Sequence, residues 1–267
     1  MKRSRAQIVI TVGPGSDGLK TLEAMVQAGA DVVRLNFSWA NLDDHGAQID
    51  LVRKIEKRER IHIPIIADMP GPRIQGEAGH TYDKDKRSAI TKQDEEYIRF
   101  AVKRGVDYIA VSFVGSAKDI EKCREIVDEV GGSQRVIAKI ERRVALDHLD
   151  AIIAATDAVM VARGDMGNEV PLEEIPFVQE RIIKACKAAK KPVITATEMM
   201  LSMVNSPKPE RAEVTDVSTA IVEGSDAVML SDETARGKYP IETVTMMEKT
   251  LLAAERHLGD KEKVNLL

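Results

Sequence analysis

The sequence predicts a (β/α)₈ barrel, an α/β fold in which eight parallel strands close into a ring and a helix follows each strand. Short apolar runs rich in Val and Ile alternate with longer segments of helical periodicity along the whole chain of 267 residues. Eight such pairs follow one another without a linker, a low-complexity tract or a second domain, so we expect one domain over 1–267. An open doubly wound sheet is the alternative, but eight regular units without a topological break favour the barrel.

The strands are expected, in chain order, at residues 7–12, 31–37, 63–68, 107–113, 135–141, 158–162, 192–197 and 226–231. The helices that follow them are expected at 19–29, 42–59, 92–105, 117–131, 144–156, 172–190, 210–224 and 240–258, each ending near Gly, Lys or a polar cluster. The irregular stretch runs from Met69 to Thr91, and it is longer and more polar than an ordinary connection between a strand and a helix.

Composition excludes several classes of function. The net charge is −4 and no Lys/Arg stripe is interleaved with aromatic residues, so we expect no nucleic-acid partner. No apolar run approaches the roughly 18 residues of a membrane span, and the basic N-terminal tip passes into a strand without a signal-peptide cleavage site. Cys123 and Cys186 lie far apart in helical patterns, which is typical of reduced core thiols. We expect a cytoplasmic protein that contacts no membrane.

Charged residues occur inside strands, and the alternation of side chains along a strand explains where they point. In the fifth strand, Val136, Ala138 and Ile140 lie on one face, which suits packing against the helices. The other face contains Ile137, Lys139 and Glu141 and therefore points to the barrel axis. In the second strand, the same alternation makes three polar side chains point toward the mouth of the barrel: Arg34, Asn36 and Ser38. In the seventh strand, it places Thr195 and Thr197 on the side of the barrel axis. Active sites of this fold lie at the C-terminal ends of the strands.

A rim of opposite charges is therefore expected at the mouth of the barrel. It contains three carboxylates and two cations, namely Arg34, Asp68, Lys139, Glu141 and Asp165. Any one of them, taken alone, is more simply interpreted as solvated or as part of an ion pair. Together they favour a divalent ion and an anionic substrate, and oxygen ligands favour Mg²⁺ or Mn²⁺. The glycines of "ARGDMG" let backbone N–H groups approach a small anion.

The motifs "RLNFS", "AKIE", "MVARGDMG-EVP", "KPVITATEMM-SM" and "P-P-RAE-TDV-TAI--G-DAVMLS-ETA-G-YP" occur in order over nearly the whole chain. In sequence and spacing they resemble the catalytic barrel of the pyruvate kinase family. The resemblance implies phosphoryl transfer between phosphoenolpyruvate and ADP, giving pyruvate and ATP, with Mg²⁺ (or Mn²⁺) and usually K⁺.

The resemblance also implies a role for each matching residue. Glu141 and Asp165 would bind Mg²⁺, Lys139 would stabilise the transferring phosphoryl group and the enolate, and Arg34 would hold the phosphate. The substrate carboxylate would be bound by the backbone of Gly164 and Asp165 and by the hydroxyl of Thr197, which lies near the proton transfer to the enol carbon. Three potassium ligands of the family would correspond to Asn36, Ser38 and Asp68.

Several departures from the family pattern concern the nucleotide and the monovalent ion. The inserted lid domain of the family is reduced to a short loop, 76–88, and we expect no C-terminal domain after the eighth helix. In "DMPGPRIQ", Met69 replaces a potassium-ligating Thr, Gln75 replaces a phosphate-binding Arg, and Arg73 occupies a position where its guanidinium could supply the monovalent charge itself. The sequence thus leaves open both potassium dependence and productive binding of ADP/ATP.

Three hypotheses follow. The first is a minimal pyruvate kinase, in which the short loop substitutes for the lid. The second is an Mg²⁺-dependent lyase or decarboxylase that acts on a 2-oxo acid through an enolate and needs no nucleotide. The third is a non-catalytic barrel that binds a metabolite, although a buried lysine is a costly residue for a scaffold. Any homodimer would form through barrel helices, around the sixth to eighth.

Overall fold

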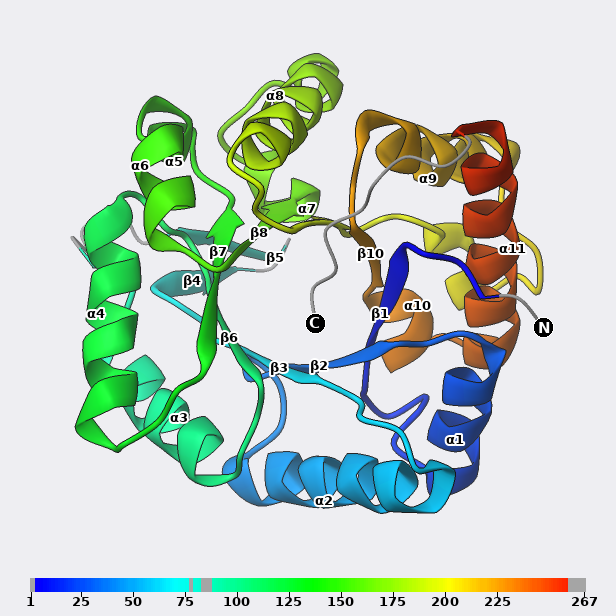
Figure 1. The fold of residues 1–267 in the computed structure, drawn as a ribbon, viewed down its shortest axis with the longest axis horizontal. Coiled ribbons are helices and arrows are strands. Elements are labelled where there is room, and N and C mark those ends of the chain that lie inside the picture. Colours follow the sequence, from blue (N-terminus) through cyan, green and yellow to red (C-terminus); the bar gives the residue numbers. More distant parts are fainter. Residues whose placement is uncertain (1–2, 77–78, 83–87, 259–267) are drawn as a thin grey trace.

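The centre of the molecule is a closed barrel of parallel strands surrounded by helices (Figure 1). The structure, a computed structural model, describes residues 3–76, 79–82 and 88–258. The barrel strands are β1 (Gln7–Thr11), β2 (Val32–Asn36), β3 (Ile65–Asp68), β6 (Tyr108–Val111), β7 (Arg135–Ile140), β8 (Ala158–Ala162), β9 (Val193–Ala196) and β10 (Ala227–Leu230). They follow chain order around the ring, and β10 pairs with β1 to close it. The predicted (β/α)₈ barrel is confirmed.

Each expected helix is found close to its expected bounds. The long helices are α1 (Leu19–Ala28), α2 (Leu42–Glu59), α3 (Lys92–Lys103), α4 (Ala117–Glu129), α8 (Ile175–Ala188), α9 (Arg211–Glu223) and α11 (Pro240–Leu258). The fifth helix is divided into α5 (Arg143–Asp147) and α6 (Leu149–Ala155). Shorter elements are α7 (Arg163–Met166), α10 (Asp232–Ala235) and the 3₁₀ turns η1 (Leu172–Glu174) and η2 (Leu201–Val204). Within the described residues, no helix is both long and apolar enough to span a bilayer.

A β-hairpin occupies part of the stretch that was expected to be irregular. Strands β4 (Arg73–Gly76) and β5 (Gly79–Tyr82) pair antiparallel, with Arg73 opposite Tyr82. The expectation of irregular backbone is therefore wrong for these eight positions, because "RIQG" and "GHTY" lack the apolar alternation by which strands are recognised. Of the expected loop 76–88, residues 77–78 and 83–87 lie outside the described part of the chain.

The two faces of the barrel strands belong to two different apolar clusters. The larger cluster packs strand residues such as Val33, Ala138 and Val161 against the helices, and it contains the buried thiols of Cys123 and Cys186. The smaller cluster takes the alternate strand positions and fills the barrel interior with Val9, Val32, Ile66, Tyr108, Ala110, Ile137, Ala158, Met160, Ala162, Ile194, Ala196, Ala227 and Met229. Because apolar residues fill the interior, polar side chains that reach it must lie at its ends.

The segment before β1 is bound to the last helix, α11. Ser4 donates from its backbone N–H and from its hydroxyl to the Glu248 carboxylate, at 2.8 and 2.7 Å. The backbone N–H groups of Arg5 and Ala6 donate to Glu255 Oε1, at 2.8 and 2.7 Å. Together with the pairing of β1 and β10, these bonds close the ring between residues separated by as many as 250 positions.

Candidate active site

The axis-facing charges of the fifth barrel strand, β7, have the predicted orientation. Val136, Ala138 and Ile140 belong to the cluster that faces the helices, whereas Ile137 belongs to the interior cluster. Lys139 therefore shares the face of Ile137, and its Nζ reaches across the mouth of the barrel to a carboxylate at the end of β3. The lysine is 4% exposed, so its charge is compensated by neighbouring protein groups rather than by water.

Asp68, at the end of β3, lies between two buried cations. Its Oδ2 accepts from Arg34 Nε at 2.7 Å and its Oδ1 accepts from Lys139 Nζ at 3.0 Å. Arg34, on the neighbouring strand β2, also donates from Nη1 to Thr11 Oγ1 at 3.0 Å. Burial alone would raise the pKa of Asp68, but the charges of Lys139 and Arg34 outweigh it, so the pKa is lowered and the carboxylate remains ionised.

Lys139 has two further polar neighbours. Its Nζ donates to Ser112 Oγ at 2.7 Å and lies 3.0 Å from Glu141 Oε1. Burial would lower the pKa of Lys139, but the carboxylates of Asp68 and Glu141 oppose this and the net result is a raised pKa. The side chain is thus a permanent cation at neutral pH.

Glu141 follows β7 directly, and one of its oxygens lacks a well-oriented hydrogen bond. Oε2 accepts from the backbone N–H of Phe113 at 2.6 Å, whereas Oε1 is buried and, among the described residues, accepts no hydrogen bond beyond the ion pair with Lys139. Burial raises the pKa of Glu141 to about 7, and the charge of Asp165 acts in the same direction. The ion pair with Lys139 therefore offsets the burial of this carboxyl group only in part.

Strand β8 leads into the backbone of "ARGDMG", for which the sequence predicts anion binding. The strand passes into the short helix α7, which contains Gly164 and Asp165. The N–H of Gly164 donates to Thr197 Oγ1 at 2.8 Å, and Thr197 Oγ1 itself donates to the Ala196 carbonyl at 2.6 Å. The end of β8 and the end of β9 thus bring a backbone donor and a hydroxyl together.

The predicted orientation of Thr195 is wrong. Its neighbours Ile194 and Ala196 point into the barrel, so Thr195 points to the helices, where its Oγ1 lies 2.6 Å from Ser225 Oγ. The sequence argument extended the alternation from Thr195 to Thr197, but β9 ends at Ala196 and Thr197 has a left-handed backbone with φ of 70°. Thr197 reaches Gly164 because of that turn and not through strand alternation.

The residues that the resemblance matches to potassium ligands lie at the ends of the neighbouring strands β2 and β3, where Asn36 is paired with Asp68. Asn36 Oδ1 accepts from the Ser38 N–H at 3.1 Å, and Ser38 Oγ is a buried atom that lacks a hydrogen-bond partner among the described residues. Arg73 donates from Nε to the Pro70 carbonyl at 2.8 Å and places its guanidinium 5.7 Å from the centre of the Phe113 ring. Arg73 is thus not among the groups that contact Asp68.

Direct contacts connect four of the predicted residues, Arg34, Asp68, Lys139 and Glu141, and a separate contact connects Gly164 with Thr197. Sequence reasoning missed three groups that contact them: the hydroxyls of Thr11 and Ser112, and the N–H of Phe113. Strand alternation could have found both hydroxyls, because Thr11 follows Val9 and Ser112 follows Ala110 on the axis-facing side. A backbone N–H has no such signal.

Known proteins resemble this chain over most of its length. A family model described as pyruvate kinase, barrel domain, matches residues 3–87 and 84–244. Pyruvate kinase of Agrobacterium vitis is 35% identical over an alignment covering 95% of this chain and 70% of the relative. Pyruvate kinase of Thermococcus litoralis is 33% identical over 95% of this chain and 70% of the relative, and that of Bacillus licheniformis is 34% identical over 97% and 58%.

The alignments contain more positions than the chain has residues. The match to the Agrobacterium vitis protein extends over 334 positions, compared with 267 residues in this chain. The relatives therefore carry internal segments without a counterpart here. The two segments of the family match meet at residues 84–87, directly after the β4–β5 hairpin.

Proposed function

Because the chain belongs to the pyruvate kinase family, we propose that it is a phosphotransferase that moves a phosphoryl group between phosphoenolpyruvate and ADP, giving pyruvate and ATP. The observation that carries the proposal is the buried Lys139, held as a cation between Asp68 and Glu141 at the mouth of the barrel. Phosphoryl transfer requires positioning and charge neutralisation more than covalent chemistry, and a fixed cation supplies both.

For the other residues we propose the roles that membership of the family implies. The guanidinium of Arg34 binds the phosphate, and Lys139 stabilises the charge that develops on the phosphoryl and enolate oxygens. The N–H groups of Gly164 and Asp165 and the Thr197 hydroxyl bind the substrate carboxylate, which displaces the present contact between Gly164 and Thr197. The Thr197 hydroxyl then lies beside the proton transfer to the enol carbon.

The donor set fits the divalent ion, Mg²⁺ or Mn²⁺, that the family implies. Glu141 and Asp165 would hold it, because Glu141 Oε1 is buried without a well-oriented donor and the pKa of Glu141 is raised by burial. No group of three or more His, Cys, Asp or Glu side chains suited to a metal occurs in the described ranges, so the substrate and water supply the remaining ligands. When bound, the ion neutralises charge on the substrate's oxygens.

The principal test is a coupled assay with phosphoenolpyruvate and ADP. Lys139→Met should lower the rate by at least about 100-fold, the scale on which loss of one preorganised charge acts. Lys103→Met removes the same charge from an exposed helical position and should leave the rate unchanged. Equal rates for the two variants would refute the assignment of Lys139.

The metal assignment has its own test, which is independent of turnover. Calorimetric titration of Mn²⁺ in the presence of oxalate, a planar mimic of the pyruvate enolate, should show binding that disappears in Glu141→Gln. The control Glu173→Gln alters an exposed carboxylate and should bind as the unmodified protein does. Retained affinity in Glu141→Gln would place the ion elsewhere.

A second candidate is an Mg²⁺-dependent lyase or decarboxylase of a 2-oxo acid. It is supported by the β4–β5 hairpin, which we propose stands in place of the family's lid domain, because a nucleotide is then less enclosed. Decarboxylation of oxaloacetate without nucleotide, measured on the same preparation, distinguishes the candidates. A catalytically inactive barrel is the third candidate, and turnover in either assay excludes it.

We propose that the phosphotransferase activity is independent of potassium. Asp68 has both oxygens occupied by Arg34 and Lys139, and Met69 offers a thioether, a poor ligand for a hard ion. Arg73 adds a fixed positive charge from the adjacent hairpin. Rates should be nearly equal in Na⁺, K⁺ and tetramethylammonium buffers, and Arg73→Glu should create a potassium requirement. Strong potassium activation of the unmodified protein would contradict the proposal.

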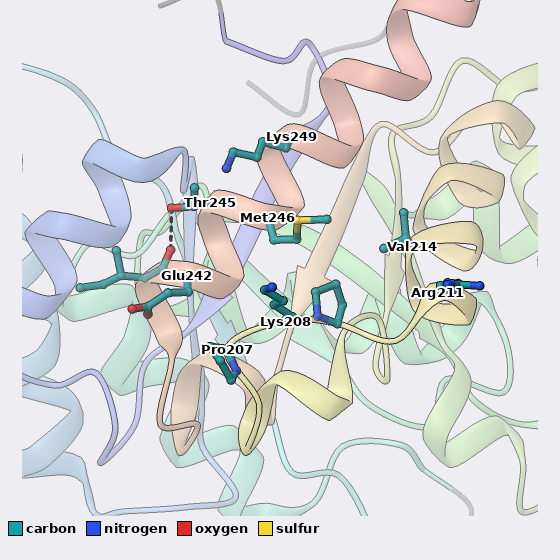
Figure 2. Close-up of a pocket in the computed structure, with 10 residues that line it drawn as sticks. Pro207, Lys208, Arg211, Val214, Glu242, Thr245, Met246 and Lys249 are labelled. Carbon is teal, nitrogen blue, oxygen red and sulfur yellow. Dashed lines mark hydrogen bonds between the residues drawn. The ribbon is translucent and has the colours of Figure 1, made fainter.

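We also propose a homodimer through the helices of the last three units. Five of the eight exposed large apolar side chains of the described residues lie there, namely Leu172, Phe177, Leu201, Val222 and Ile241. A groove lies on this side between the segment before α9 and helix α11, and its lining includes Ile241. Figure 2 shows three other lining residues, Pro207, Val214 and Met246. Light scattering should give a dimer that dissociates in Phe177→Ser but not in Ile61→Ser, which alters an exposed residue elsewhere.

A further inference from the structure

The β4–β5 hairpin contacts the mouth of the barrel through a row of four side chains, in which two cations flank a pair of aromatic rings. The guanidinium of Arg142 lies 3.6 Å from the centre of the Tyr82 ring, at the end of β5. The Tyr82 ring is tilted at 52° to the Phe113 ring, and the ring centres are 5.5 Å apart. The guanidinium of Arg73 lies over the Phe113 ring. Such pairs are attractive and directional, so they fix the hairpin relative to the ends of β6 and β7.

Phe113 is the member of this row that touches the candidate active site. Its φ is 56°, a left-handed conformation that a bulky side chain rarely adopts. That conformation is accompanied by the hydrogen bond from the Phe113 N–H to Glu141 Oε2, at 2.6 Å. Residues held in such conformations persist only where the surrounding structure determines them.

The surroundings of the Phe113 ring supply that constraint. At Gly71, just before the hairpin, a Cβ would lie 3.0 Å from Phe113 Cδ2, so the ring packs directly on backbone. The Gly71 N–H is itself fixed by Asp94 Oδ1, at 3.0 Å. On the other side, the ring meets Tyr82, which Arg142 covers.

We propose that Tyr82 and Arg142 are positioning residues for metal binding: through the Phe113 ring they hold the Phe113 N–H that orients the Glu141 carboxylate. Arg142 follows Glu141 directly in the chain, so one short segment supplies both the carboxylate and the cation that covers the hairpin. The packing of the hairpin on Phe113 thereby influences the orientation of the Glu141 carboxylate. The inference rests on the proposed function in one respect, because it takes Glu141 as a metal ligand.

The test uses two measurements on the full chain. The first is amide hydrogen exchange of Phe113 in the metal-free protein, followed by NMR. The second is calorimetric titration with Mn²⁺ in the presence of oxalate. Tyr82→Leu and Arg142→Gln should each accelerate exchange at Phe113 and raise the Mn²⁺ dissociation constant about tenfold, the scale found when a partner of a metal ligand is removed.

Two further variants separate positioning from general destabilisation. Tyr82→Phe keeps the ring and should restore both values to within about twofold of the unmodified protein. Ile74→Ser alters an exposed position on the same hairpin and should also leave both values unchanged. A folding defect would instead raise exchange throughout the barrel strands, and Arg142→Gln provides a second substitution if Tyr82→Leu does not fold.

Unchanged exchange at Phe113 in both variants would overturn the proposal while leaving the proposed function intact. Faster exchange with unchanged Mn²⁺ affinity would also overturn it, because the N–H would then not orient the metal ligand. Failure of the unmodified protein to bind Mn²⁺ would overturn the metal assignment of the proposed function, and this inference with it.

Discussion

Replacing Asp68 by Asn should destabilise the fold far more than the same replacement in an exposed ion pair. The Asp68 side chain is 1% exposed and lies 2.7 Å from Arg34 Nε, whose side chain is 9% exposed. Its other oxygen receives Lys139 Nζ at 3.0 Å. The two cations lie at different oxygens of Asp68, and Asn has an oxygen at only one of these positions, so its NH₂ would face the other donor.

The magnitude follows from which contacts remain. Lys139 keeps Glu141 and Ser112, whereas Arg34 keeps one hydrogen bond, to Thr11, so Arg34 accounts for most of the loss. Leaving a buried charge without its partner costs about 3–5 kcal/mol. With an m value of about 3 kcal/mol/M in urea, the unfolding midpoint should fall by roughly 1–1.7 M.

Asp50→Asn provides a matched control for urea denaturation. Asp50 lies 2.6 Å from Arg104 Nη2, but the two side chains are 72% and 34% exposed. An exposed pair contributes about 0–1 kcal/mol, so the midpoint should shift by no more than about 0.3 M. Similar midpoints for Asp68→Asn and Asp50→Asn would refute the argument that burial, and not distance, determines the effect.

Two further predictions concern other parts of the fold. Burial raises the pKa of Asp31 to about 6. The stability contributed by the protonated Asp31 is therefore complete below the pKa of the unfolded state and is lost as pH rises through 6. Asp31→Asn should remove this pH dependence from the free energy of unfolding, measured between pH 4.5 and 7.5. Gly71→Ala should lower the melting temperature more than Gly105→Ala, although both glycines have a φ of 67°, because only at Gly71 would the new Cβ meet Phe113. Equal melting temperatures would contradict the packing argument.

Strand alternation predicted the barrel and its charged rim because one face of each strand is covered by helices and the other by the barrel interior. Lys139 and Arg34 could be placed by counting residues along their strands, since a period of two holds as long as the backbone stays extended. The same count places Thr11 and Ser112 on the axis-facing side, but hydroxyl side chains at strand ends are common and do not by themselves indicate a site.

The rest of the site depends on backbone conformations that the sequence does not reveal. Thr197 and Phe113 both have positive φ although neither is glycine, and each places a polar group where alternation would not. The β4–β5 hairpin was missed for a related reason, because its strands are fixed by cross-strand pairing and by the contact of Tyr82 with Phe113, not by an apolar face.

The seam between β1 and β10 has a consequence for synthesis on the ribosome. The N–H groups of Arg5 and Ala6 and the open edge of β1 find their partners only after Glu255 and the strand Ala227–Leu230 have been translated. At 5–20 residues per second, that interval is on the order of 10–50 s. During it, the segment "QIVIT" carries an unpaired, apolar strand edge, which is the kind of surface that recruits other chains. Nascent chains should therefore bind chaperones until helix α11 emerges.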